Sequence, residues 1–248
     1  MRILLINSNT SDVVTAKVLA GGRLAASPGT EVEAVCGTFG ARVIGTRSEN
    51  AIAEHSTIAL AAKHAAGFDA AVIAVSYDTG LRGARELLPI PVVGMTEASM
   101  FTACLLGGRL GVITFGRRVL PLYQELAQGY GVSGRIVGWR AIESTAAYKP
   151  GNDAELDRLL VDTALELVER EMAEVIVLTG AVMAGVAARL QPQLPVPMVD
   201  GVTCGVRQAE LLARSRYPKP TTGSYAAPGG RELIDVSPEI AAMFREGA

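Results

Sequence analysis

Residues that could carry out chemistry follow directly after apolar runs in this 248-residue chain. The most reactive group is the hydroxyl, phenol and carboxylate of Ser76, Tyr77 and Asp78, which follow the apolar run 69–75. Three such groups in succession predict a catalytic cluster, in which Ser76 acts as a nucleophile or orients an attacking water. The alternative is that Tyr77 and Asp78 cap the next helix while Ser76 only fills space.

Other polar loops follow further apolar runs and supply hydroxyls, amides and free backbone N–H groups. Such groups suit a small carboxylate or a cyclic amide. One loop of this kind is equally well explained by helix caps and turns, but several loops at matching places favour a ligand site. We therefore expect substrate-binding roles for Asn7, Asn9, Thr10, Thr79, Thr114, Thr179, Gly180 and Asp200.

Two kinds of residue in these loops leave alternatives open. Asp200 could act as an acid or base, or it could only fix its own loop. Arg117 and Arg118 follow the run that ends at Thr114, so one of the two could clamp a carboxylate while the other is solvated. Residue type alone does not choose between the two arginines.

The three cysteines and two histidines offer little support for a metal site or a disulfide framework. Cys36, Cys104 and Cys204 are an odd number at wide spacing, without a C-x-x-C pair. His55 and His64 fall on nearly opposite faces of an expected helix, so a shared metal ion is not expected. No glycine-rich dinucleotide motif follows a strand. We therefore expect an enzyme without a metal or other cofactor.

The overall composition is typical of one globular domain over residues 1–248. Apolar residues make up 49% of the chain and charged residues 19%, and the formal net charge is -2. This balance argues against nucleic acid and membrane partners and favours a small-molecule substrate. Because the chain opens on a strand pattern and no run reaches membrane-spanning length, the expected location is cytoplasmic. A homo-oligomer is expected for so apolar a chain.

Short apolar runs alternate with helical patterns, which predicts an α/β fold with parallel strands and helices on both faces. The expected strands are 2–6, 31–35, 69–75, 91–94, 110–114, 135–139, 175–178 and 196–199. The expected helices include 13–26, 48–66, 81–88, 202–215 and a short terminal helix at 238–245.

Three segments of the first half recur in the second half, in the same order and at nearly constant spacing. They are 2–7, 72–73 and 89–93, which match 109–114, 175–176 and 195–199. The repeat predicts two pseudo-symmetric α/β halves, roughly 1–107 with the C-terminal segment, and 108–215. Equivalent strand ends would then border one cleft, where ligands of open α/β sheets bind. The alternative is that any two β-α units look alike.

The same loops resemble a known family. Residues 7–11 (NSNTS) look like the I-N-P-N-T-S start of hydantoin and allantoin racemases, with Ser8 where proline is usual. Residues 72–81 (VIAVSYDTGL) are similar to the family's V-I-A-C-F-x-D-P/T-G-L, and residues 175–183 (VIVLTGAVM) to its V-I-V-L-G-C-A-G-M. The chain thus resembles the aspartate/glutamate/hydantoin racemase superfamily over almost its whole length.

The resemblance implies a cofactor-free route in which two facing cysteines exchange a proton at the substrate's α-carbon. This chain has neither cysteine: an ungapped match places Val75 at the first position and Gly180 at the second. A shift of one residue would place Ser76 at the first. Neither alignment supplies a thiol, so the usual two-base mechanism is not expected here.

Three functions follow from these observations. The first is a cofactor-independent superfamily enzyme that acts on a small carboxylate or a cyclic amide or imide without cysteine. The second is a hydrolase or lyase that opens a cyclic amide or imide with Ser76, while the amides of the Asn7 to Thr10 loop and Thr114 hold the oxyanion. The third is a protein that has lost catalysis and only binds a small ligand.

Overall fold

Short aliphatic runs form the strands of the computed structural model, which describes residues 1–143 and 153–245. Most strand residues are buried, as parallel strands covered by helices require. The strands are β1 (Arg2–Asn7), β2 (Glu31–Cys36), β3 (Ala70–Ile73), β4 (Val92–Gly94), β5 (Leu110–Phe115), β6 (Ile136–Ile142), β7 (Val175–Leu178) and β8 (Met198–Asp200).

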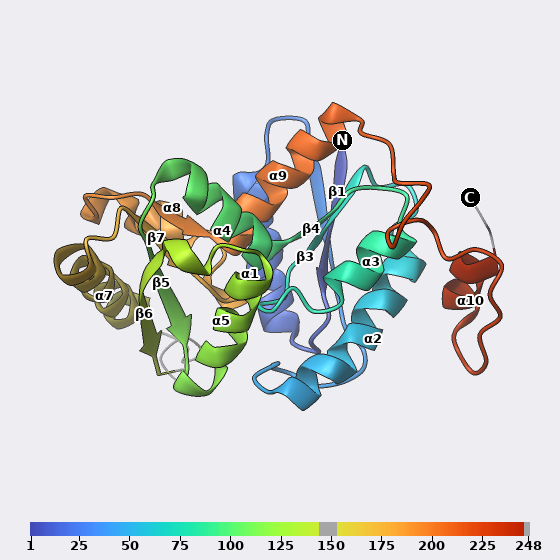
Figure 1. The fold of residues 1–248 in the computed structure, drawn as a ribbon, viewed down its shortest axis with the longest axis horizontal. Helices are drawn as coiled ribbons and strands as arrows, with labels where there is room; N and C mark the ends of the chain where they lie inside the picture. The colour runs from blue at the N-terminus through green and yellow to red at the C-terminus, as the bar shows by residue number, and fades with distance from the viewer. Residues whose placement is uncertain (144–152, 246–248) are drawn as a thin grey trace.

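The strands pair into two parallel sheets, in the orders β2-β1-β3-β4 and β6-β5-β7-β8. These orders coincide when β1 to β4 are matched with β5 to β8, so the predicted α/β class with two parallel-sheet halves is confirmed. Figure 1 shows the two sheets side by side.

Strand register corrects one of the predicted internal matches. Leu5 pairs with Val72 in the first sheet, and Val112 pairs with Val177 in the second. Because Leu5 and Val112 are matched positions, the counterpart of Val72 is Val177 and not Val175. The sequence match slipped by two residues because an even shift along an aliphatic strand keeps every side chain on its own face.

The helices begin where a side chain or a turn can satisfy the free N–H groups of the first turn. The α-helices are α1 (Asp12–Ala25), α2 (Arg47–His64), α3 (Leu81–Leu87), α4 (Met95–Leu106), α5 (Leu120–Gly129), α7 (Asp153–Glu171), α8 (Val186–Leu190), α9 (Gly201–Ser215) and α10 (Pro238–Arg245). Ser11 caps α1 and Thr46 caps α2 through their side-chain oxygens. None of the described helices is long and apolar enough to cross a bilayer.

The two halves exchange one helix each. Helix α4 follows β4 but packs against β7 and β8, where Ala103 joins the core around Val175. Helix α9 follows β8 but packs against β3 and β4, where Val206 joins the core around Val72. Each sheet is therefore covered by the helix that follows the other sheet, and the division at residues 107 and 108 stays a prediction. Figure 1 shows both helices in the middle of the molecule.

The C-terminal segment returns to the first half. Helix α10 packs against α2, and Met243 contacts the core of the first sheet. Lys219 Nζ donates to the backbone oxygens of Arg85 at 3.3 Å and Leu88 at 2.8 Å, at the end of α3. The segment thereby holds α3, which follows the Ser76 turn.

Candidate active site

The turns that follow β3 and β7 occupy equivalent places in the two sheets. Ala74 N donates to a backbone oxygen of β1 at 2.9 Å, and Thr179 N donates to one of β5 at 3.0 Å. The next residues, Val75 and Gly180, are therefore counterparts. They are also the two positions at which the ungapped sequence match places the family's cysteines.

A cavity of about 210 Å³ lies between these two turns. Ser76 and Tyr77 line it from the first half, and Gly180 and Val182 line it from the second. The rest of its lining is Val43, Ile44, Gly45, Phe115, Gly116, Arg118, Val119 and Tyr123. It is smaller than the roughly 300 Å³ at which cavities for drug-sized ligands begin, so it suits a small ring.

Ser76 connects the two halves at this cavity. Its Oγ accepts a hydrogen bond from Ala181 N at 3.4 Å, and its backbone oxygen accepts one from Thr96 Oγ1 at 2.6 Å. Because Oγ accepts, the hydroxyl proton can be donated to a ligand oxygen. None of the described lining residues is a histidine, lysine or carboxylate, so none of those bases activates Ser76.

Two buried tyrosines of the cavity contact each other. The rings of Tyr77 and Tyr123 lie 5.1 Å apart at an angle of 56°. Tyr123 lies on α5, so this contact also joins the two halves. Tyr123 was not predicted as a site residue, because it lies in a helix and not in a strand-end loop. The available signal was its position one helical turn after Val119, on the same face as that cavity residue.

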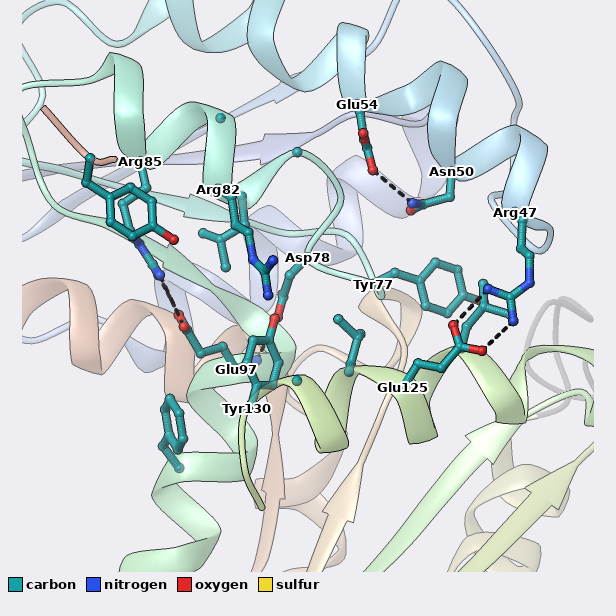
Figure 2. Close-up of a pocket in the computed structure, with 18 residues that line it drawn as sticks. Arg47, Asn50, Glu54, Tyr77, Asp78, Arg82, Arg85, Glu97, Glu125 and Tyr130 are labelled. Atoms are coloured by element: carbon teal, nitrogen blue, oxygen red, sulfur yellow. Dashed lines mark hydrogen bonds and ion pairs between the residues drawn. The ribbon is translucent and has the colours of Figure 1, made fainter. Parts of the chain in front are cut away.

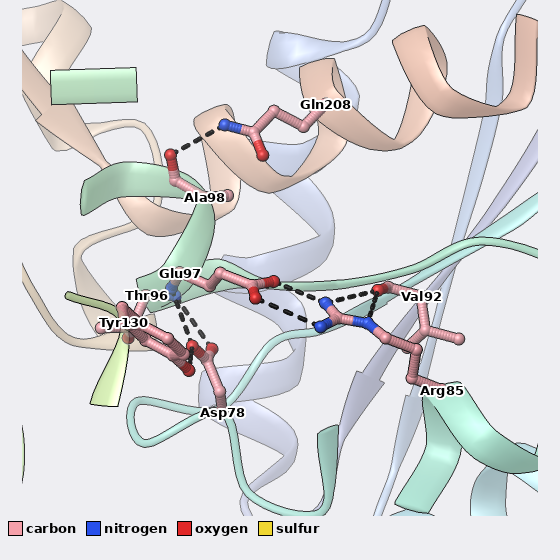
Figure 3. Close-up of polar contacts among 8 residues, drawn as sticks. All are labelled: Asp78, Arg85, Val92, Thr96, Glu97, Ala98, Tyr130 and Gln208. Atoms are coloured by element: carbon pink, nitrogen blue, oxygen red, sulfur yellow. Dashed lines mark hydrogen bonds and ion pairs between the residues drawn. The ribbon is translucent and has the colours of Figure 1, made fainter. Parts of the chain in front are cut away.

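Asp78 is buried against the first turn of α4 and lies outside the residues that line the cavity. Its Oδ1 accepts from Thr96 N at 2.9 Å, and its Oδ2 accepts from Glu97 N at 2.7 Å and from the Tyr130 hydroxyl at 2.7 Å (Figure 3). Burial raises the pKa of Asp78 to about 7. The carboxylate therefore caps α4, not the next helix along the chain, and the catalytic role of Asp78 stays a prediction.

The residues around Asp78 extend this polar cluster away from the cavity. Glu97 forms an ion pair with Arg85, with an Oε2–Nη2 distance of 2.5 Å, and Arg85 also donates to the backbone oxygen of Val92 (Figure 3). Burial raises the pKa of Tyr130, and the adjacent Asp78 raises it further, so the phenol keeps its proton. The cluster fixes the Ser76 turn on α4 and α5.

Thr79 and Thr10 stabilise loops and do not line the cavity. Thr79 Oγ1 donates to Asn50 Oδ1 at 2.6 Å, and the Thr79 backbone oxygen accepts from Thr57 Oγ1 at 2.8 Å, so Thr79 binds its turn to α2. Thr10 N donates to the backbone oxygen of Ala41 at 3.0 Å. The structure thus brings neither residue to the position expected for a direct ligand contact.

Buried oxygens without partners mark the ends of β1 and β5. Asn7 Nδ2 donates to Asn9 Oδ1 at 2.9 Å, and Ser11 N donates to the same oxygen at 2.9 Å. Within the described residues, Asn7 Oδ1, Ser8 Oγ and Thr114 Oγ1 are buried and have no hydrogen-bond partner. Buried polar atoms are nearly always paired, so these three oxygens are unusual, but none of their residues lines the cavity.

Thr179 and Asp200 are buried and bonded within the protein. Thr179 Oγ1 donates to the backbone oxygen of Ile113 at 3.0 Å. Asp200 Oδ1 accepts from Thr203 N at 2.9 Å, and its Oδ2 accepts from Thr203 Oγ1 at 2.8 Å. Burial raises the pKa of Asp200. Asp200 therefore caps α9 and fixes its own loop, and neither residue lines the cavity.

Gly180 lines the cavity without filling it. A Cβ atom there would meet Phe115 at 3.5 Å, an ordinary contact, but the backbone has a φ of +97°, which side-chain-bearing residues rarely adopt. The turn is therefore built for glycine, and the second-half side of the cavity stays open where the family's second cysteine would stand.

The three cysteines do not line the cavity. Burial raises the pKa of Cys204 to about 11, so its thiol stays protonated near neutral pH. Burial also raises the pKa of Cys36. Cys104 packs beside the core of the second sheet.

A larger groove of about 710 Å³ shares Tyr77 with the cavity. Figure 2 shows Tyr77 and Asp78 at this groove, together with the ion pair between Arg47 and Glu125. The groove has no lining from the turn after β7, whereas the smaller cavity joins both strand-end turns. The smaller cavity is therefore the candidate active site. The described residues contain no group of three or more His, Cys, Asp or Glu that could hold a metal ion.

Similar folds and sequences occur in known racemases. The Asp/Glu/Hydantoin racemase family model matches residues 3–209. Hydantoin racemase of Rhizobium meliloti is 32% identical over 229 residues, which cover 92% of this chain and 95% of that protein. Allantoin racemase from Klebsiella pneumoniae has a TM-score of 0.89 and 30% identity, over 99% of this chain and 100% of that chain. Allantoin racemase from Pseudomonas fluorescens has a TM-score of 0.87 and 32% identity, over 94% of this chain and 100% of that chain. This chain belongs to the Asp/Glu/Hydantoin racemase family.

Proposed function

We propose that this chain is a cofactor-independent enzyme that acts on a small cyclic amide, imide or carboxylate by a route without cysteine. The family supports an enzyme of the racemase type. Its relatives are named for hydantoin and allantoin, which both contain a five-membered ring with two amide-type nitrogens. A ring of that class is therefore the ligand we assign to the cavity.

One observation carries the proposal: a single cavity is lined by Ser76 and Gly180, which belong to equivalent strand-end turns. A ring carbonyl beside Ser76 would accept the hydroxyl proton that the bond from Ala181 leaves available. Asn7 and Thr114, whose oxygens lack partners, lie on the neighbouring strands β1 and β5 and are assigned to substrate binding as part of this proposal.

The reactive groups differ from those of a two-cysteine racemase. Val75 and Gly180 cannot exchange a proton, and Cys204 stays protonated and outside the cavity. Among the described lining residues, Ser76, Tyr77 and Tyr123 carry the hydroxyls that can donate or accept a proton. These three groups are the ones to which we assign proton transfer or the orientation of water.

Ring opening is the second candidate, because the two strand-end turns are chemically unequal. The first supplies Ser76 and Tyr77, whereas the second supplies Gly180 and Val182. Racemisation needs proton exchange on both faces of the α-carbon, but hydrolysis needs reactive groups on one side only. A water oriented by Ser76 would add to the ring carbonyl, the C–N bond would break, and the ring nitrogen would take a proton.

Proton NMR in heavy water tests these functions directly. We would incubate the protein with 5-substituted hydantoins, allantoin, cyclic imides and amino-dicarboxylates. Loss of the α-proton signal without new products indicates carbanion chemistry and racemisation. New ring-opened products without exchange indicate the second candidate. Binding without either change would contradict catalysis and leave only ligand capture.

Substitution of Ser76, which lines the cavity, and of Asn9, which holds the loop after β1, then tests the assigned groups. Ser76→Ala and Asn9→Ala should each lower turnover by at least about tenfold, the scale at which a positioned donor or an oxyanion loop contributes. Cys204→Ala is the matched control and should keep wild-type turnover, measured with the same NMR assay. An inactive Cys204→Ala enzyme would restore a thiol mechanism, and full activity of Ser76→Ala would reduce that residue to packing.

A further inference from the structure

A second cavity adjoins the candidate active site. It has a volume of about 270 Å³ and shares Gly45 and Arg118 with the active-site cavity. The rest of its lining is Thr46, Arg47, Ser48, Pro121 and Leu122. Because two residues border both spaces, a ligand ring in the first cavity could extend a substituent past Arg118 toward the second.

The lining of this second cavity is cationic. It includes two arginines, and no carboxylate is among its described lining residues. Arg47 is already bound, since its two Nη atoms donate to the carboxylate of Glu125 at 2.7 and 2.5 Å. Arg118 makes no hydrogen bond or ion pair to the described residues, although its charge contributes to the lowered pKa of Glu49. Arg118 is therefore the positive charge that remains available at the junction.

The neighbouring arginine shows that this placement is specific to one side chain. Arg117 precedes Arg118 in the same short helical turn, η1 (Arg117–Val119). Arg117 lines neither cavity and lies 4.0 Å from the carboxylate of Glu143. Both arginines are exposed, so they differ in what they border rather than in burial.

We propose that Arg118 forms a subsite for a carboxylate on the ring substituent, so that this enzyme selects cyclic amides or imides with an anionic side arm. This inference rests on the proposed function, because the ring is taken to occupy the active-site cavity. A planar guanidinium binds carboxylate through paired N–H donors. The neighbouring negative charge is Glu49, whose Oε2 accepts from Gly45 N at 2.9 Å and which lines neither cavity.

Isothermal titration with two isosteric probes tests the subsite. The probes are 5-(2-carboxyethyl)hydantoin and its neutral primary amide, titrated into wild type, Arg118→Met and Arg117→Met. Wild type should bind the acid about fivefold more tightly than the amide, the scale of an exposed charge pair. Arg118→Met should abolish this preference and leave amide binding within about twofold, because methionine retains the apolar stem. Arg117→Met should keep the preference.

The outcomes separate this inference from the proposed function. Equal binding of acid and amide by wild type, or equal losses in the two variants, would overturn the subsite. If wild type binds neither hydantoin, the ring assignment fails, and glutarate then serves as a ring-free probe. Glutarate binding that weakens in Arg118→Met but not in Arg117→Met would sustain the anion subsite, and binding that is absent or the same in all three proteins would overturn it.

Discussion

The two halves provide the same helix cap from different places. Helices α4 and α9 are counterparts that follow β4 and β8. The N-cap of α9 is Asp200, whose own carboxylate accepts from Thr203 N. The N-cap of α4 is Gly94, which has no side chain, and the carboxylate comes instead from Asp78 in the turn after β3. Both helix termini thus receive a negative group, which their dipoles favour.

Steric contact explains why the first half uses a glycine. The cap that Asp78 provides to α4 from another turn is called the trans cap. A Cβ atom at Gly94 would lie 2.5 Å from the Asp78 Cγ, so the trans cap needs a residue without a side chain at position 94. The counterpart of Asp78 in the second half is Met183. Met183 N donates to Gly180 O at 3.0 Å, just as Asp78 N donates to Val75 O at 2.9 Å. Met183 packs into the second core.

The position of the Asp78 carboxylate makes the two sides of the active site unequal. In the first half, the turn that carries Ser76 is bonded to α4 through Asp78 and to α5 through Tyr130. In the second half, Met183 makes the corresponding turn apolar, and Gly180 leaves the cavity open. A duplicated fold can therefore keep its strand order while its two faces acquire different chemistry.

Removal of the trans cap should have the largest effect on stability. We expect Asp78→Ala to lower the free energy of unfolding by about 3 kcal/mol, because the Thr96 and Glu97 amides and the Tyr130 hydroxyl lose their buried acceptor. Urea unfolding at pH 8 measures this change.

A double variant sharpens the comparison by giving α4 the arrangement of α9. Asp78→Ala with Gly94→Asp should regain about half of the loss, since alanine leaves room for the new N-cap side chain. A double variant no more stable than Asp78→Ala would contradict the equivalence of the two caps.

Loss of the cap in the second half should cost less. We expect Asp200→Ala to lower the free energy of unfolding by about 1 to 2 kcal/mol, because the amide and hydroxyl of Thr203 lose a partner and the amides of Gly185 and Val202 lose the same acceptor. Asp12→Ala, an exposed first-turn change in α1, is the control in the same urea series. A loss at Asp200 equal to that at Asp78 would refute the idea that the trans cap does more than satisfy a helix terminus.

The sequence predicted the layout of the fold because its signals are local. Aliphatic runs and polar strand ends recur in both halves, and these patterns place the strands and the terminal helix 238–245. The exchange of α4 and α9 was missed because a helix with an apolar face, read from sequence, carries no information about which sheet it covers. That choice depends on the three-dimensional crossing of the chain.

The candidate site was predicted in part for a related reason. Ser76, Tyr77 and Gly180 reach the cavity because strand ends of parallel sheets converge. The cap that Asp78 forms on α4 was not predicted, because in sequence a carboxylate that caps a distant helix looks like a catalytic group next to a serine. Tyr123 lies in a helix, and only the packing of α5 across the two halves brings it to Tyr77.

The smallest effect is expected from the hydroxyl that joins Asp78 to α5. Tyr130→Phe should lower the free energy of unfolding by about 1 kcal/mol, because one hydrogen bond to the Asp78 carboxylate is lost. The two amides of α4 still donate to that carboxylate. Tyr217→Phe, which changes an exposed tyrosine outside this cluster, is the control.

The pH dependence of this variant tests the charge on Asp78. Its folded pKa of about 7 exceeds the ordinary 3.8, so the protonated carboxyl favours the folded state and wild-type stability should decline as pH rises from about 4 to about 7. The Tyr130 hydroxyl lowers the pKa of Asp78, so its removal should raise that pKa and extend the decline to higher pH. Urea unfolding of Tyr130→Phe and wild type between pH 5 and pH 9 measures the difference. Parallel pH profiles would mean that the phenol does not sense the carboxylate charge, and the first turn would then be held by the α4 cap alone.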